Sequence, residues 1–121
     1  NIGMSQLEEL GFELRHVGIN CQNEEEACQV AGRFDTIFGL TKKVGNSSVF
    51  AGTAVEAMKK PYLGKNGHIA IGTTDVAKAV EYLESQGVEV DMDTAKYKNE
   101  KLTAVYIKEE IGGFAVHLVQ K

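Results

Sequence analysis

The chain of 121 residues has no tryptophan, a single proline, two cysteines and no long apolar run, and each shortage excludes something. A membrane-spanning helix needs about 20 consecutive apolar residues, and no stretch approaches that length. A binding protein of the drug-sequestering kind is disfavoured, because such sites rely on aromatic stacking and tryptophan is absent. The formal net charge of −4 argues against non-specific nucleic-acid binding.

The two cysteines do not make a disulfide framework. Cys21 and Cys28 lie close together in the sequence, across a predicted boundary between a strand and a helix. We interpret both as free thiols. Because no secretory signal is visible either, the sequence predicts a cytoplasmic protein.

What the chain does contain is an internal repeat. The strand-like segments Phe12–Asn20 and His68–Thr73 each carry a histidine followed by small and β-branched residues, in RHVGIN and GHIAIG. An amphipathic helix with a polar cap is predicted after each strand, and Gly39 or Gly87 ends it. About three short strands follow each helix.

The repeat predicts an α+β fold built from two tandem βαβββ modules, residues 12–60 and 67–121. Neither module has enough apolar surface to be stable alone, so both should pack into one sheet-rich domain, residues 12–121. The linking loop Lys59–Gly67 holds the only proline, Pro61, and marks the module boundary. We interpret residues 1–11 as a short polar helix or linker, an N-terminal extension of the domain.

Alternation of side chains along a strand assigns the polar residues to faces. In the repeated strands the valine and the isoleucines should face the helices, which places His16 and His68 on the opposite face. The same alternation in AVEAM and FAVHLVQ places Glu56 and His117 on that opposite face as well. The residues that flank them are small and leave room: Gly18, Ala57, Ala70 and Ala115.

Three histidines and one carboxylate on one concave face are suitable ligands for a divalent metal ion, whether zinc, nickel, manganese, cobalt or ferrous iron. Such an ion would polarise a carbonyl or stabilise an enolate. In the alternative interpretation each histidine is a hydrogen-bonded structural residue and the glutamate is solvated, since isolated residues of these types usually are. No short motif such as H-E-x-x-H decides between the two.

Other polar residues leave the substrate open. Five cations have the charge to pair with a phosphate or a carboxylate, but we interpret them as solvated surface residues: Arg15, Lys59, Lys60, Lys96 and Lys98. The tyrosines that accompany them, Tyr62, Tyr97 and Tyr106, receive no assignment.

At the residues that carry the repeat, the chain resembles the vicinal-oxygen-chelate superfamily, which includes glyoxalase I, methylmalonyl-CoA epimerase and extradiol dioxygenases. HVGI opens one module and HIAI the other, and the resemblance covers about residues 12–121. It implies a glyoxalase-like curved mixed sheet around a concave site. It also implies metal ligands from the first and last strands of each module, which are His16 and Glu56, then His68 and His117.

One departure from the family pattern affects the expected chemistry. The last strand of many relatives has the form G-N-x-[IV]-E-L, whereas this chain reads GGFAVHLVQ, so His117 stands where a glutamate is expected. In glyoxalase-type enzymes a ligand carboxylate also abstracts a proton, and that catalytic role falls to Glu56 here. The resemblance implies a lyase or isomerase that acts on a small 2-oxo or 2-hydroxy compound as a homodimer.

From FELRHVGIN to GGFAVHLVQK the chain also resembles the glyoxalase-like C-terminal domain of some bacterial 4-hydroxy-2-oxoglutarate / 2-dehydro-3-deoxy-phosphogluconate aldolases. A start at Asn1 followed by the linker-like LEELG fits a domain that follows an upstream aldolase domain. Aldolase chemistry itself is not expected, because a Schiff-base barrel needs roughly 200 residues or more. The alternative function is therefore a non-catalytic module that binds a metabolite or holds subunits together for such an aldolase.

Overall fold

The computed structural model describes residues 2–121, and the surroundings of side chains from residue 6 onward. Within this part of the chain the elements follow one another as α1 (Ile2–Leu10), β1 (Glu13–Asn20), α2 (Glu24–Phe38), β2 (Lys42–Val44), β3 (Ser48–Ala51), β4 (Val55–Met58), β5 (Gly67–Thr73), α3 (Val76–Ser85), β6 (Val90–Lys98), β7 (Lys101–Ile111) and β8 (Phe114–Gln120). After α1, the predicted βαβββ order occurs twice. No helix in this described range is long and apolar enough to cross a membrane.

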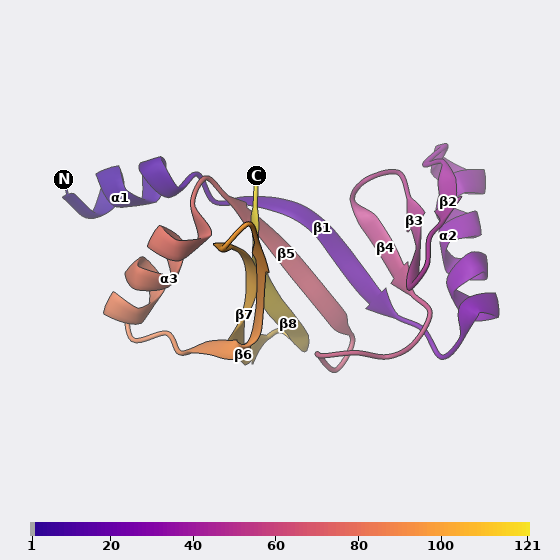
Figure 1. Ribbon diagram of the computed structural model, residues 1–121. Coiled ribbons are helices and arrows are strands. Elements are labelled where there is room, and N and C mark those ends of the chain that lie inside the picture. The colour runs from indigo at the N-terminus through magenta and orange to yellow at the C-terminus, as the bar shows by residue number, and fades with distance from the viewer. Residues whose placement is uncertain (1) are drawn as a thin grey trace.

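All eight strands form one mixed sheet in the order β2-β3-β4-β1-β5-β8-β7-β6. The opening strands of the modules, β1 and β5, pair antiparallel at its centre. Each is flanked by the last strand of its own module in parallel, β4 beside β1 and β8 beside β5. The two modules therefore occupy equivalent halves of the sheet, as Figure 1 shows, and the predicted α+β fold of two modules is confirmed.

Each module helix begins where its capping residue stands. The side chain of Asn23 accepts a hydrogen bond from the backbone N–H of Glu26 at 2.9 Å, and three glutamates in the first turn of α2 favour its positive end. Asp75 caps α3 in the same way through the N–H of Lys78 at 3.0 Å. Gly39 ends α2 in the left-handed conformation, with φ of +72°, which glycine adopts without a steric cost.

The helices bury their apolar stripes against one face of the sheet, one in each half. In the first module, buried residues of α2 pack with those of β3 and β4, and the cluster consists of Cys21, Ala27, Ala31, Val49, Ala51 and Ala57. In the second, α3 packs on β6 to β8, and the cluster consists of Leu10, Val76, Ala79, Val80, Val90, Val105 and Leu118. Because Ile19 and Ile71 also contact these clusters, the predicted core-facing side of β1 and β5 is confirmed.

The segment before the first module is helical, and its end is attached to the second module. Leu10 is buried in that module's core, and its carbonyl accepts hydrogen bonds from the Thr73 hydroxyl at 2.6 Å and the Thr74 N–H at 3.0 Å. The predicted extension over residues 1–11 therefore includes a residue of the core, while Asn1 lies outside the described residues.

The hairpin of β6 and β7 is longer than the sequence predicts. The sequence predicts short strands after the helix, whereas β6 runs to Lys98 and β7 begins at Lys101 and extends to Ile111. The two residues between them, Asn99 and Glu100, both have positive φ, 52° and 66°. A two-residue turn with positive φ at both residues matches the right-handed twist of the two strands. Such turns usually contain a glycine, and this one does not, so the sequence does not indicate it.

Candidate metal centre

The register of the sheet explains why four polar side chains meet. Gly18 of β1 is the partner of Glu56 on β4 and of His68 on β5, so a residue without a side chain lies between two long ones. One step along the strands, Ala70 of β5 is the partner of His16 on β1 and of His117 on β8. In each set of three partners, the residues on the two flanking strands have long side chains and the central residue is small. The two long side chains can therefore lean toward each other over the central residue.

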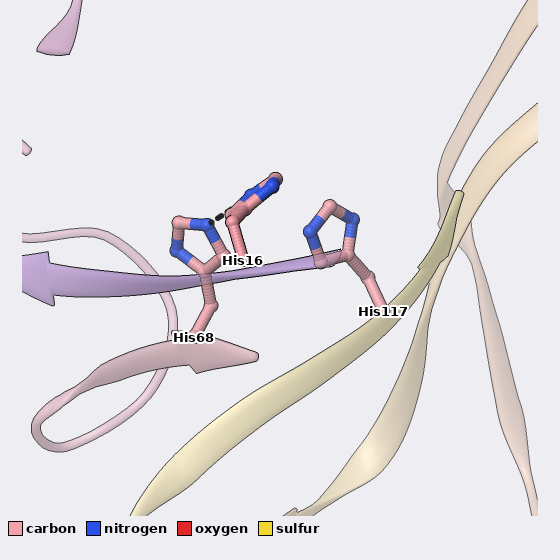
Figure 2. A group of neighbouring side chains, drawn as sticks. All are labelled: His16, His68 and His117. Atoms are coloured by element: carbon pink, nitrogen blue, oxygen red, sulfur yellow. Dashed lines mark hydrogen bonds between the residues drawn. The ribbon is translucent and has the colours of Figure 1, made fainter. Parts of the chain in front are cut away.

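Three of the four side chains are in direct contact. Nε2 of His16 lies 3.2 Å from Nε2 of His68. Oε1 of Glu56 lies 3.3 Å from Nε2 of His16 and 3.1 Å from Nε2 of His68. His117 completes the cluster from the other side, and one nitrogen from each histidine lies within 4.8 Å of the other two. Figure 2 shows the three rings converging from β1, β5 and β8.

Gly18 makes the position of His68 possible. A Cβ atom built on Gly18 would overlap the Cε1 and Nδ1 atoms of the His68 ring, so the ring lies directly over the β1 backbone. His68 is 3% exposed there, and its Nδ1 atom has no hydrogen-bond partner among the described residues. The glycine is therefore needed for space, because its φ lies outside the left-handed range.

Glu56 is held as an anion by three donors. The buried hydroxyl of Ser48 donates to its Oε2 at 2.7 Å, while both histidines face its Oε1. Burial by itself would raise the pKa of Glu56, but the hydrogen bonds from His16, His68 and Ser48 outweigh it and hold the pKa well below its usual range. Ser48 thus fixes the orientation of the carboxylate.

His117 is a neutral imidazole with an unused nitrogen. Burial, followed by the nearby charges of His68 and His16, lowers its pKa to about 3. Its Nε2 atom is buried and has no hydrogen-bond partner among the described residues. Tyr106 fixes the ring by stacking on it, with centroids 4.5 Å apart and planes inclined by 12°.

The cluster lines a cavity of about 310 Å³ together with residues from both modules. Besides the cluster, its lining consists of Ser47, Met58, Tyr62, Thr94, Lys96, Ala104, Val105, Tyr106 and Val119. Burial, then the proximity of Tyr62 and Glu56, raises the pKa of Tyr106 to about 12, so its hydroxyl keeps its proton. Lys96 lies close enough to His117 to contribute to the lowered pKa there.

The structure brings together all four residues that the sequence singled out, His16, Glu56, His68 and His117. Sequence reasoning missed Ser48, because the pairing of β3 with β4 that places it beside Glu56 is not visible in the sequence. Tyr106 received no assignment, although its alternation with Val105, a core residue, could have placed it on the polar face.

Three of the four donor atoms are spaced as the ligands of one divalent metal ion would be. Atoms bound to one ion at about 2.0–2.2 Å lie roughly 2.8–3.6 Å apart, from right-angled to tetrahedral geometry. The three contacts among His16, Glu56 and His68 fall in this interval. The unpartnered Nε2 of His117 is the candidate fourth donor, because a buried imidazole nitrogen without a hydrogen bond is costly unless something binds it. One nitrogen of His117 lies within 4.8 Å of one nitrogen of each of the other two histidines, which is farther than the three contacts above.

No protein-family model matches the chain, and no curated protein does. Among solved structures, a hypothetical protein from Bacillus halodurans aligns over 92% of this chain and 95% of its own, with 13% identity and a TM-score of 0.63. A variant methylmalonyl-CoA epimerase from Streptomyces coelicolor, in complex with 2-nitronate-propionyl-CoA, aligns over 90% of this chain and 94% of its own, with 17% identity and a TM-score of 0.62. The epimerase from Mycobacterium tuberculosis aligns over 88% of this chain and 86% of its own, with 17% identity and a TM-score of 0.56. At these identities the similarity concerns the fold, and the chain shares the glyoxalase-like fold of these proteins.

Proposed function

We propose that the domain binds one divalent metal ion through His16, Glu56, His68 and His117, and presents it to a small 2-oxo or 2-hydroxy compound. The observation that carries the proposal is the buried, unpartnered Nε2 of His117, which faces two histidines already gathered around a carboxylate. Zinc, nickel, manganese, cobalt and ferrous iron all accept this donor set. When bound, such an ion supplies Lewis acidity toward a carbonyl or an enolate.

Within this proposal Glu56 is the residue that moves a proton beside the substrate carbonyl, in a lyase or isomerase reaction. It is the only carboxylate that lines the cavity, and the cavity has a volume typical of small-molecule sites. An isomerase-type reaction is supported by the shared fold, since two of the similar structures are epimerases by name. To act as a base, Glu56 has to exchange its hydrogen bonds to the histidines for contact with the substrate.

A second candidate is a non-catalytic module that binds a metabolite, or supports assembly, for an attached aldolase. It is favoured by the hydrogen bonds of Glu56, because both of its oxygen atoms are already occupied, Oε1 by two histidines and Oε2 by Ser48. A carboxylate held in this way is a good ligand and a poor base. In either role we expect a cytoplasmic homodimer.

Metal binding is tested on protein purified without chelators, by elemental analysis and by the absorption spectrum after cobalt addition. We expect one ion per chain and a rise in melting temperature with zinc, nickel, cobalt or manganese. His16→Ala and His68→Ala should lose both effects, whereas Glu25→Gln on the exposed side of α2 should keep them. All three histidines of the chain belong to the cluster, so imidazole ligation seen by X-ray absorption can only come from this site. Absence of bound metal together with an unchanged melting temperature contradicts the proposal.

The two roles separate in a proton-exchange assay. The metal-loaded domain is incubated with pyruvate or 2-oxoglutarate in deuterated water, and loss of the C3 proton signal is followed by NMR. Enzymatic exchange that Glu56→Gln abolishes supports the lyase or isomerase role. Binding of these compounds without any exchange above the solvent background favours the accessory module.

A further inference from the structure

One wall of the cavity carries two donors that the metal cluster does not use. Lys96 of β6 is the Cα partner of Ala104 on β7, and Tyr106 follows two residues later on the same face of β7. Both side chains line the cavity beside His117. The small side chain of Ala104 keeps the space between them open.

Lys96 is an unpaired cation. No carboxylate lies within ion-pairing distance of it among the described residues, whereas Lys59, which follows β4, is engaged by Glu24 at 2.9 Å. Apart from Glu56 and the histidines, Lys96 is also the only charged side chain in the cavity lining. Lys96 is exposed to solvent where it lines the cavity, and no neighbouring carboxylate compensates its charge.

With a divalent ion bound, the charges of the site would add to a net positive value. Three neutral imidazoles and one carboxylate would leave the ion with one excess positive charge, and Lys96 would add a second. A cavity with two uncompensated positive charges would attract an anion.

Tyr106 supplies a directional donor beside that cation. Its ring is fixed by the stacking on His117 and by edge contacts with His68 and Tyr62, whose centroids lie 6.5 and 6.0 Å away. Its hydroxyl has no hydrogen-bond partner among the residues that the structure describes, although its backbone N–H is bonded to Thr94 at 2.9 Å. A rigid ring with a free hydroxyl in a cavity is suited to contact a ligand oxygen.

We propose that this wall is an anion subsite, in which Lys96 pairs with a carboxylate of the substrate and the Tyr106 hydroxyl donates a hydrogen bond to one of its oxygens. The substrates are then 2-oxo or 2-hydroxy carboxylates, not neutral carbonyl compounds. This inference rests on the proposed metal centre for the placement of the remaining substrate oxygens. Tyr106 and Lys96 act in it as specificity-determining residues.

The experiment measures oxalate binding to the zinc-loaded protein by calorimetry, with uncharged oxamide as the comparison ligand and zinc retention checked in each sample. Lys96→Met should weaken oxalate about tenfold or more, because a lost charge-assisted contact has that effect, and Tyr106→Phe should weaken it severalfold. Lys96→Arg should keep most of the affinity. Lys98→Met removes the same charge from the same strand outside the cavity lining and should change little. Raised salt should weaken oxalate and leave oxamide unaffected.

Zinc affinity, measured separately, distinguishes this inference from the metal proposal. If Lys96→Met keeps zinc and binds oxalate as tightly as the wild type, the anion subsite is refuted while the metal centre stands. If the wild type binds no zinc, oxalate is titrated into the metal-free protein and the His117 and Tyr106 NMR signals are followed. Shifts that Lys96→Met abolishes then support the subsite without the metal, and the absence of shifts overturns it.

Discussion

Replacing Gly18 by alanine tests the packing of the site directly. The added methyl group would occupy the volume of the His68 ring, which is 3% exposed. Moving the ring away from the methyl group would cost its 3.1 Å contact with Glu56. The backbone conformation at Gly18 suits alanine, because its φ lies outside the left-handed range. Any cost of the substitution therefore arises from the side-chain clash.

Three contributions set the magnitude. Displacing the ring removes a hydrogen bond between His68 and the Glu56 carboxylate, which is worth about 1.5–3 kcal/mol. Crowding of a well-packed position costs about 1–3 kcal/mol. Alanine also restricts the unfolded chain more than glycine does, which offsets about 0.4–1 kcal/mol of the lost stability. We expect Gly18→Ala to lower the free energy of unfolding by about 1.5–5.5 kcal/mol and to abolish metal binding.

The assay is urea denaturation followed by circular dichroism, with Gly32→Ala as the matched control. Gly32 lies in α2 with nothing within 4 Å of an added Cβ, so alanine there should stabilise the protein by about 0.5–1 kcal/mol. In a His68→Ala background the cost of Gly18→Ala should fall below about 1 kcal/mol, which is the signature of a direct clash. Equal cost in both backgrounds, or none in the wild type, refutes the reasoning.

Three further predictions concern the titration of the site, the thiols and the β6–β7 turn. In the metal-free protein the pKa of His117 is lowered to about 3, so below pH 6.5 the unfolded chain binds a proton that the folded chain does not. Between pH 7 and pH 5 the unfolding free energy should thus fall by about 2 kcal/mol more in the wild type than in His117→Gln, as urea titrations at both pH values will show. Burial, then Glu26, raises the pKa of the Cys21 thiol, so iodoacetamide followed by mass spectrometry should modify Cys28 first; faster labelling of Cys21 would contradict its burial. Glu100→Gly should raise the unfolding free energy by about 1 kcal/mol, because Glu100 has a φ of 66°, and an unchanged urea midpoint would count against strain in that turn.

The sequence by itself determined the modules, their helices and the faces of their strands. These features depend on local periodicity and on capping residues such as Asn23 and Asp75, which act within a few residues of their position. Alternation alone placed His16, Glu56, His68 and His117 on the face away from the helices. The family resemblance then implied that these four residues are metal ligands.

Only the tertiary structure decided which of these side chains touch. The antiparallel pairing of β1 with β5 and the parallel pairing of β1 with β4 put Gly18 between His68 and Glu56, residues that are far from it in the sequence. The pairing of β3 with β4 brought Ser48 to the cluster, and the pairing of β7 with β8 brought Tyr106 to it. Strand order and register are set by the burial of both cores together, so no local pattern in the sequence contains them. The face on which these four residues lie was local information, and their proximity to one another is a property of the whole sheet.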